Sequence, residues 1–277
     1  MPDASTGLVV LLGDPVEHSL SPQIHNAAFQ AQGLNLIYLA CRVPPARLAD
    51  AINGLDALGA VGANVTIPHK QGALALATSA SPAAQATGAA NTLVRTPDGW
   101  HVDNTDVEGF LDPLTPYADS LRDELAIVIG AGGAARAVAW ACTERLGARV
   151  VVAARRQEQA DALAMALGVE ALTIDEAQVL QREAALVVNA TPVGMAPHAS
   201  STPWSFPSGL RSSQIAYDLV YRPAKTRFLR EAEVAGATCI GGLPMLIGQA
   251  AASYRQWTNC EMPLDVVREI LTRQSDA

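Results

Sequence analysis

A glycine-rich turn between an apolar strand and a helix is the feature that most constrains the fold of this chain. The apolar run Leu125–Ile129 is followed by Gly130-Ala131-Gly132-Gly133-Ala134-Ala135 and by a helical pattern that continues to about Arg145. In a G-x-G-x-x-A turn the first glycine permits the bend, the second admits a pyrophosphate, and the last small residue allows close helix packing. Free amides at the helix N-terminus attract the anion. The sequence therefore predicts a dinucleotide-binding unit; the alternative is a glycine-rich turn without a ligand.

The end of the next strand indicates which dinucleotide would bind. A NAD-specific domain carries an acidic residue about 20 residues after the glycines, where it accepts hydrogen bonds from ribose hydroxyls. Here the strand-like run Arg149–Ala154 leads instead into Arg155-Arg156. A guanidinium can hold a 2′-phosphate through two parallel hydrogen bonds. The sequence predicts NADP as the cofactor, with two solvated loop arginines as the alternative.

Strand-like and helical patterns alternate along the whole chain, which predicts an α/β protein with largely parallel sheets. From residue 125 onward the strand-like segments are 125–130, 149–154, 170–173, 186–190, 214–219 and 238–240. Six strands suit a Rossmann domain. The Ala- and Leu-rich segments from about residue 243 lie beyond that count, and we expect them to pack on the first half of the chain.

The first half of the chain shows its own alternating series. Strands are expected at 8–12, 36–41 and 62–67, and helices at 21–32 and 46–58. Pro68 fits the first turn of a further helix. Two short strands near 89–95 and 100–102 flank an Asp-Gly turn signal. This half is therefore a second α/β domain.

Polar residues gather where the strand at 62–67 ends. Because side chains alternate along a strand, Asn64 and Thr66 share one face, and Lys70 follows just beyond. Ligands bind at the carboxyl ends of strands in open parallel sheets, so these residues are candidates for a substrate site. The alternative is that Asn64 and Thr66 satisfy loop amides while Lys70 is simply exposed.

At two helix starts, polar residues can either bind a ligand or simply cap the helix. Ser19 and Ser21 can bind a carboxylate at a helix N-terminus, but Ser21 can equally be an N-cap followed by Pro22. Asp106 lies in a capping box that begins at Thr105, and the helix dipole alone favours an acidic residue there.

Composition excludes several classes of protein. The formal net charge is −8, and no run rich in Lys and Arg provides a nucleic-acid footprint. No apolar stretch approaches the roughly 18 residues of a membrane span, and no secretory leader is evident. The histidines and the four cysteines lack metal-binding or disulfide-framework spacing, and no GxSxG motif is present. We expect a cytoplasmic protein without a metal; a homodimer is compatible with the sequence, which does not determine the oligomeric state.

Seven motifs together resemble the shikimate dehydrogenase family, in order and spacing, over almost the whole chain. They are Ser19-Leu20-Ser21-Pro22, Asn64-Val65-Thr66-Ile67-Pro68-His69-Lys70, Gly88-Ala89-Ala90-Asn91-Thr92, Asp103-Asn104-Thr105-Asp106, the glycines from Gly130, Asn189-Ala190-Thr191-Pro192-Val193-Gly194-Met195, and Gly241-Gly242-Leu243-Pro244-Met245-Leu246-Ile247-Gly248-Gln249. The resemblance implies reversible, NADPH-dependent reduction of 3-dehydroshikimate to shikimate, a step in aromatic amino-acid (chorismate) biosynthesis.

The resemblance also implies a domain organisation and roles for individual residues. Residues 1–104, completed by C-terminal helices over 243–277, would form the substrate domain, and 105–242 the Rossmann NADP domain, with the site in the cleft between them. Lys70 and Asp106 would form the catalytic pair. Among the implied substrate-binding residues, Ser19 and Ser21 would hold the substrate carboxylate, and Tyr221 matches another substrate-contacting position. The others, Asn64, Thr66, Asn91 and Gln249, would hold ring hydroxyls or orient their neighbours. The implied cofactor-binding residues are Gly130, Ala131, Gly132, Gly133, Ala134, Arg155, Arg156, Thr191, Leu219 and Gly242.

One departure from the family pattern, and one position that varies with substrate preference, bear on the alternatives. The family often has Asn-Arg-Thr where this chain reads Ala154-Arg155-Arg156, so the arginine is kept while its neighbours differ. Some quinate-preferring relatives carry Thr where this chain has Ser21. The alternatives are a broader quinate/shikimate dehydrogenase and a catalytically silent sensor of pathway intermediates, although a sensor could lose Lys70 and Asp106 freely and both are present.

Overall fold

The chain folds into two compact α/β units, which we describe from a computed structural model covering residues 2–206 and 210–275. The first unit comprises Met1–Thr105 with Ile247–Ala277, and the second comprises Asp106–Leu246. Residue 1 and residues 276–277, at the ends of the expected substrate domain, lie outside the described residues. Each unit has its own sheet and its own hydrophobic core.

The first unit is built on a six-stranded sheet in the order β2-β1-β3-β5-β6-β4. Its strands are β1 (Gly7–Gly13), β2 (Leu36–Arg42), β3 (Gly62–Val65), β4 (Ser79–Ala80), β5 (Thr92–Thr96) and β6 (Gly99–Asp103). The pairs β1·β2, β1·β3 and β4·β6 are parallel, whereas β5 is antiparallel to both β3 and β6. The sheet is therefore mainly parallel with one antiparallel hairpin inserted.

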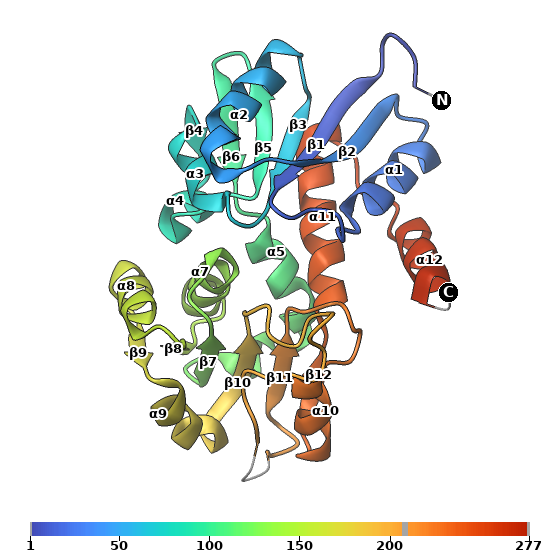
Figure 1. The fold of residues 1–277 in the computed structure, drawn as a ribbon. Helices are drawn as coiled ribbons and strands as arrows, with labels where there is room; N and C mark the ends of the chain where they lie inside the picture. The colour runs from blue at the N-terminus through green and yellow to red at the C-terminus, as the bar shows by residue number, and fades with distance from the viewer. Residues whose placement is uncertain (1, 207–209, 276–277) are drawn as a thin grey trace. The chain divides into compact units, whose positions relative to one another are not determined.

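Helices complete the first unit (Figure 1). They are α1 (Ser21–Ala31), a 3₁₀ turn (Pro45–Arg47), α2 (Leu48–Ala57), α3 (Lys70–Ala75), α4 (Pro82–Thr87) and α12 (Leu264–Ser275). Helix α1 packs on β2 and against α12. Helix α11 (Gly242–Thr258) begins in the second unit and contributes its residues from Ile247 onward to the first.

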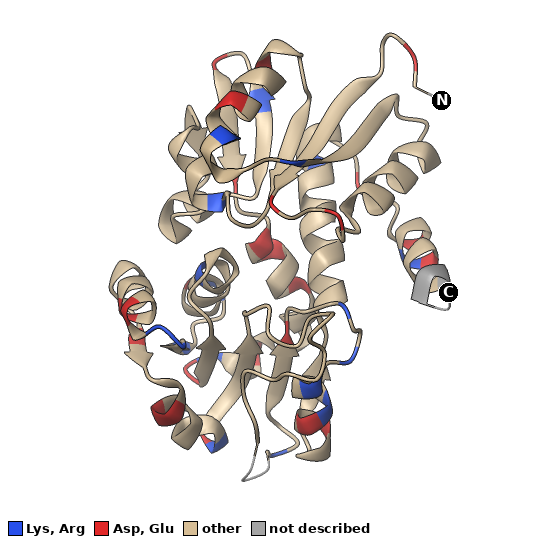
Figure 2. Ribbon diagram, in the orientation of Figure 1, with Lys and Arg blue, Asp and Glu red and all other residues tan. Residues whose placement is uncertain are grey.

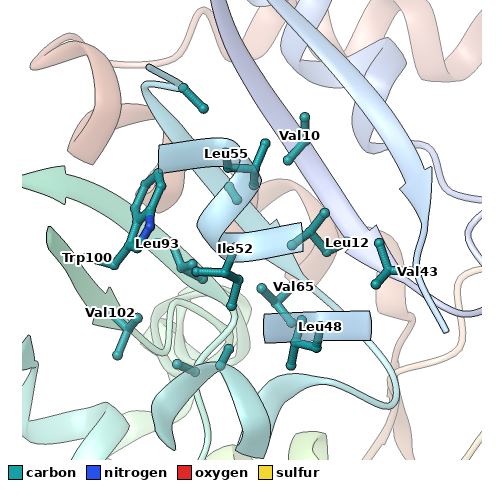
Figure 3. Packing of buried hydrophobic residues seen from close by; sticks show 14 of the residues in the cluster. Val10, Leu12, Val43, Leu48, Ile52, Leu55, Val65, Leu93, Trp100 and Val102 are labelled. Carbon is teal, nitrogen blue, oxygen red and sulfur yellow. The ribbon is translucent and has the colours of Figure 1, made fainter. Parts of the chain in front are cut away.

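Helix α2 supplies one side of the core of the first unit. Its buried residues Leu48, Ile52 and Leu55 recur at helical spacing, so they form one apolar stripe. Figure 3 shows this stripe facing apolar side chains of β1, β3, β5 and β6. Full burial of one such aliphatic side chain stabilises the fold by about 1.5–3 kcal/mol.

The second unit has the strand order of a Rossmann domain. Its sheet runs β12-β11-β10-β7-β8-β9, and every pairing in it is parallel. Read from the other edge and numbered within the unit, this is the order 3-2-1-4-5-6. The strands are β7 (Leu125–Ile129), β8 (Arg149–Ala153), β9 (Glu170–Leu172), β10 (Ala184–Asn189), β11 (Ile215–Asp218) and β12 (Thr238–Ile240).

Every residue of the central strand β7 is buried, which indicates that helices cover both faces of this second sheet. They are α5 (Asp106–Leu111), α6 (Ala118–Leu121), α7 (Gly133–Trp140), α8 (Gln157–Leu167), α9 (Ile174–Val179) and α10 (Arg227–Val234), with 3₁₀ turns at Asp112–Tyr117 and Leu180–Arg182. Helix α7 continues into a π-helical turn, Ala141–Arg145. The expected fold class, two α/β domains of which the second is a Rossmann domain, is confirmed.

Three local expectations are corrected. Strand β3 ends at Val65 and α3 starts only at Lys70, so Pro68 lies in the turn between them, where the His69 amide donates to the Thr66 carbonyl. Ser21 is the first residue of α1 rather than its N-cap, a position that Leu20 occupies without a side-chain cap. Strand β5 begins at Thr92 instead of residue 89, because the Ala90 amide is bonded to the Lys70 carbonyl outside the sheet.

Candidate active site

The predicted substrate residues of the first unit gather at one edge of its sheet. Strands β1 and β3 run parallel and end there. Because β5 is antiparallel to β3, its start lies beside the end of β3, with Asn64 opposite Thr92. Strand β6 ends at the same edge, since Thr92 is also opposite Asp103. The topology thus brings together three sequence motifs that are far apart along the chain.

Asn64 lies inside a buried polar cluster at this edge. Its Oδ1 accepts a hydrogen bond from the Tyr38 hydroxyl at 2.8 Å. Its Nδ2 lies 3.1 Å from the Asn91 carbonyl, 3.1 Å from Thr92 Oγ1 and 3.0 Å from Ser253 Oγ. Both arms of the amide therefore have partners within the protein, which favours an orienting role for Asn64 over contact with a substrate.

Asn91 is held in one orientation by the same cluster. Its Oδ1 accepts from the Thr105 amide at 2.8 Å, from Thr105 Oγ1 at 3.1 Å and from Thr92 Oγ1 at 3.1 Å. The opposite arm of the amide, Nδ2, can act only as a donor. These contacts fix the orientation of the Asn91 amide, with Nδ2 as its donor arm.

Four members of this cluster were not among the predicted site residues: Tyr38, Thr92, Thr105 and Ser253. Thr92 and Thr105 stand in the quoted motifs, whereas Tyr38 and Ser253 do not. Ser253 Oγ donates to the carbonyl of Gln249 one helical turn earlier at 3.0 Å, which ties the cluster to the predicted substrate residue on α11. A spacing of four residues on a helix marks such neighbours. That spacing was the only signal in the sequence that could have pointed to Ser253.

Ser19 and Ser21 lie just before and at the start of α1. The Ser21 amide donates to Ser19 Oγ at 3.2 Å, which fixes the hydroxyl of Ser19 beside the first helical turn. Burial raises the pKa of the Tyr38 phenol, and a hydrogen bond with the buried Ser21 side chain partly offsets that rise. Tyr38 therefore bridges Ser21 and Asn64, so two motifs predicted to bind substrate share a single hydrogen-bond network.

Lys70 and Thr66 flank the turn after β3. Lys70 is half-buried at the first position of α3, and its carbonyl accepts from the Ala90 amide at 2.9 Å. His69 beside it is buried, with Nε2 2.7 Å from the Val43 carbonyl. Thr66 is partly exposed, and its amide donates to the Leu12 carbonyl. These backbone bonds anchor the segment that carries the candidate catalytic lysine.

Asp106 is the first residue of the second unit and of α5, and its side chain is buried. In the preceding residue, the Thr105 hydroxyl lies 3.1 Å from both Thr92 Oγ1 and Ser253 Oγ, within the polar cluster of the first unit. These hydrogen bonds therefore fix the position of Thr105, which directly precedes Asp106.

The glycine-rich turn of the second unit has the geometry that a pyrophosphate needs. Gly130 has φ +122°, and a Cβ there would lie 3.0 Å from the Ala190 carbonyl oxygen. A Cβ at Gly132 would meet no atom within 4 Å. The first helical hydrogen bond runs from the Arg136 amide to the Gly132 carbonyl, so the amides of Gly133 and Ala134 precede the bonded turns of α7. Open space beside helix amides fits a dinucleotide phosphate.

Arg155 and Arg156 are both exposed in the connection between β8 and α8. Figure 2 shows this connection as a basic segment at the carboxyl edge of the sheet. Neither guanidinium forms an ion pair with the residues that the structure describes. Two cations thus follow the strand next to the glycine turn, where an adenosine 2′-phosphate would be recognised.

The remaining cofactor candidates follow β10, β11 and β12, at the same carboxyl edge. Thr191 donates from both its amide and its hydroxyl to Asn189 Oδ1, at 3.0 and 2.7 Å. Leu219 and Tyr221 follow β11, and burial raises the pKa of the Tyr221 phenol. A Cβ at Gly242 would stand 2.2 Å from the Leu219 carbonyl oxygen, so only glycine allows this approach of two backbones.

Nothing in the described ranges indicates a metal site or a membrane span. Within residues 2–206 and 210–275, no group of three or more His, Cys, Asp or Glu side chains is arranged to hold a metal ion. No helix in those ranges combines the length and apolar character needed to cross a bilayer.

Three family models match the chain. They are "Shikimate dehydrogenase substrate binding domain" over residues 11–93, "Shikimate / quinate 5-dehydrogenase" over 115–196, and "Shikimate 5'-dehydrogenase C-terminal domain" over 242–272. A shikimate dehydrogenase (NADP(+)) from Salinibacter ruber is 48% identical over 97% of this chain and 98% of its own length.

Solved structures of shikimate dehydrogenases have the same fold. One, in complex with NADP⁺, has a TM-score of 0.92 and 35% identity, covering 99% of this chain and 97% of the other. Another, from Thermus thermophilus in complex with NADP(H) and shikimate, has a TM-score of 0.86 and 39% identity, covering 97% of this chain and 99% of the other.

Proposed function

The chain belongs to the shikimate dehydrogenase family, and we propose on this basis that it catalyses the reversible, NADPH-dependent reduction of 3-dehydroshikimate to shikimate. We propose further that the first unit binds the substrate and the second binds the cofactor. The observation that carries the proposal is that each sheet edge assembles one half of the required chemistry. The first edge offers oriented hydroxyl and amide groups, and the second offers a glycine turn and two arginines.

The residues at the second edge suit NADP in charge and in shape. The amides at the start of α7 would hold the pyrophosphate, and Arg155 and Arg156 would hold the 2′-phosphate. Thr191, Leu219 and Gly242 would border the nicotinamide. When bound, NADPH supplies the hydride that reduces the ring carbonyl. The open space at Gly132, and the Ala154-Arg155-Arg156 sequence in place of an acidic residue directly after β8, support this assignment.

We assign proton transfer to Lys70 of the first unit and Asp106 of the second. A carbonyl that gains a hydride becomes an alkoxide and needs a proton, which Lys70 Nζ can donate and which an acid–base pair can relay. The assignment is to the two residues jointly and does not divide the proton between them. Positioned acid–base groups contribute about 10²–10⁴-fold in rate.

We assign the substrate carboxylate to the hydroxyls of Ser19 and Ser21. Both residues lie at the N-terminal end of α1, an eleven-residue helix whose dipole favours a negative charge there. We assign hydrogen bonding of the ring oxygens to the side chains of Asn91, Thr66, Gln249 and Tyr221. These contacts orient the ring and stay equally strong throughout the reaction. Removing them should therefore raise KM more than it lowers kcat.

The direct test is to incubate the purified protein with 3-dehydroshikimate and NADPH and to follow the nicotinamide absorbance. Turnover with shikimate and NADP⁺ in reverse should accompany it. Comparable turnover of quinate would indicate the broader quinate/shikimate enzyme, and binding of shikimate without turnover would indicate a sensor.

A lysine variant tests the catalytic assignment. Lys70→Ala should lower kcat about 10²–10⁴-fold and weaken substrate binding far less. Lys225, the chain's only other lysine, is a matched control, because it is half-exposed and pairs with Glu233 on α10. Nearly full kcat in Lys70→Ala would overturn the assignment, as would an equal loss in Lys225→Ala.

We also propose that the protein works in the cytoplasm, which is supported by the state of its thiols. All four cysteines are free, and free thiols persist in reducing compartments.

Sedimentation of the purified protein would distinguish a homodimer from a monomer.

A further inference from the structure

Asp218 is a fully buried carboxylate for which the proposed mechanism has no use. It ends strand β11, and none of its surface is exposed. Its Oδ1 accepts from Asn189 Nδ2 at 2.9 Å and from the Val220 amide at 3.0 Å. Its Oδ2 accepts from the Thr226 hydroxyl. Three donors, one at the end of β10 and two in the segment after β11, therefore converge on one buried charge.

Each donor leads to a segment with a proposed role at the cofactor. Asn189 uses its Oδ1 to accept from the amide and the hydroxyl of Thr191, so the carboxylate orients the amide that holds Thr191. Asn189 Nδ2 also reaches the Val193 carbonyl at 3.1 Å. The loop after β10 thus depends on the orientation of a single asparagine.

The second and third donors hold the loop after β11. The Val220 amide lies between Leu219 and Tyr221, and the Val220 carbonyl accepts from the Gly242 amide at 3.3 Å. Thr226 is the N-cap of α10, where its Oγ1 accepts from the Leu229 amide. Asp218 therefore holds the segment 219–226 near its start, through the Val220 amide, and at its end, through the Thr226 hydroxyl.

An ionised carboxylate accepts all three of these hydrogen bonds. A carboxylate accepts at both oxygens, whereas asparagine offers one acceptor oxygen and an amide nitrogen that cannot accept. Burial raises the pKa of Asp218 to about 6, while the bonds from Thr226, the Val220 amide and Asn189 lower it. A buried charge that is only partly compensated is costly to keep if it merely fills space.

We propose that Asp218 is a positioning residue that sets the loops carrying Thr191 and Leu219 at the nicotinamide end of the cofactor. The inference rests on the proposed function, because that function gives the two loops their roles. It adds a residue that contacts neither ligand and acts through Asn189, Val220 and Thr226.

The isosteric variant Asp218→Asn should weaken binding at the nicotinamide end of the cofactor and leave binding at the adenosine end nearly unchanged. With one acceptor lost, kcat and the affinity for NADPH should each fall about ten- to a hundredfold, as for one charge-assisted hydrogen bond. Binding of adenosine 2′,5′-bisphosphate, a probe that lacks the nicotinamide, should stay within about twofold, because the glycine turn and the arginines follow other strands. Both affinities can be measured by calorimetry, independently of activity.

Variants at Thr226 keep the proposal testable if Asp218→Asn does not fold. Thr226→Ser retains the hydroxyl and should keep kcat, whereas Thr226→Val removes the donor to Asp218 and should lower kcat. Because Thr226→Val also removes a helix cap, Thr173→Val is the matched control. Thr173 caps α9 in the same way, through its hydroxyl and the Glu176 amide, without touching Asp218. Thr173→Val should lower the Tm alone.

Three results would overturn the proposal. One is an Asp218→Asn protein with wild-type kcat and NADPH affinity, and another is equal loss of NADPH and bisphosphate binding, which would indicate general damage. The third is a loss of kcat in Thr173→Val equal to that in Thr226→Val. If the wild type binds NADPH but turns over no shikimate, the proposed function fails, while the comparison of the two binding affinities still decides the role of Asp218.

Discussion

His25 should make the protein sensitive to acid, because its imidazole is buried among aromatic rings. It stacks on Tyr38 at a centroid distance of 4.5 Å and lies 5.2 Å from the ring of Trp257. Among the described residues neither ring nitrogen has a hydrogen-bond partner. Burial lowers the pKa of His25 from 6.5 to about 3. The phenol of the nearby Tyr254 has a pKa raised by burial to about 12, so it stays neutral in acid.

The sign and size of the effect follow from proton linkage. Between pH 6.5 and about 3 the unfolded chain binds a proton at His25 that the folded chain does not, so the free energy of unfolding falls as the pH falls. From pH 7 to pH 5, a pKa difference of this size removes about 2 kcal/mol. That is a large fraction of a typical folding stability of about 5–15 kcal/mol.

The variant His25→Phe keeps a ring for Tyr38 to stack on and removes the titration. Its stability at pH 7 combines the gain from deleting unpaired polar atoms with the cost of a larger ring, so the informative quantity is the change between pH 7 and pH 5. That change should be smaller than in the wild type by about 2 kcal/mol. The burial-raised pKa of Asp218 acts in the opposite direction, but it contributes to both proteins and cancels.

Urea unfolding at the two pH values, followed by circular dichroism and tryptophan fluorescence, measures this difference. Coincident transitions are required before one free energy is assigned to a two-unit chain. His18→Phe is the control, since it removes an exposed imidazole. If wild type and His25→Phe lose the same free energy to within about 0.5 kcal/mol, burial does not keep His25 neutral and the reasoning is wrong.

Three further predictions concern the proposed site. The double variant Ser19→Ala/Ser21→Ala should raise KM for 3-dehydroshikimate with little change in kcat, and an unchanged KM would refute the carboxylate assignment. Replacing the Arg155–Arg156 pair by alanine should weaken NADP about ten- to a hundredfold more than NAD, less so at high salt; equal losses would contradict the role of the pair. Gly130→Ala should lower the Tm because its φ is +122°, whereas Gly132→Ala, with no atom within 4 Å of its Cβ, should weaken NADPH binding at an unchanged Tm. A stable, tightly binding Gly130→Ala protein would exclude the tight-turn requirement.

The sequence by itself determined the fold class and the position of most strands, because these depend on local periodicity. The apolar run before Gly130 and the glycines after it could form only a strand, a tight turn and a helix start, and all three are present. Errors fell at element ends. Pro68 lies before its helix and Ser21 just inside one, since hydrogen bonds of the His69 and Ser21 amides decide where each turn closes.

Only the tertiary structure decided which groups the polar residues contact. The sequence allowed Asn64 either to hold a substrate oxygen or to orient its neighbours, and the fold favours the second role by giving it Ser253, which is 189 positions away in the chain. Asp218 and Asn189 likewise meet only because β10 and β11 pair in parallel with these two residues in register. The alternation of side chains says which face of a strand a residue takes. Which donors meet it there depends on strand order and helix packing, and these are set by long-range burial that no local pattern records.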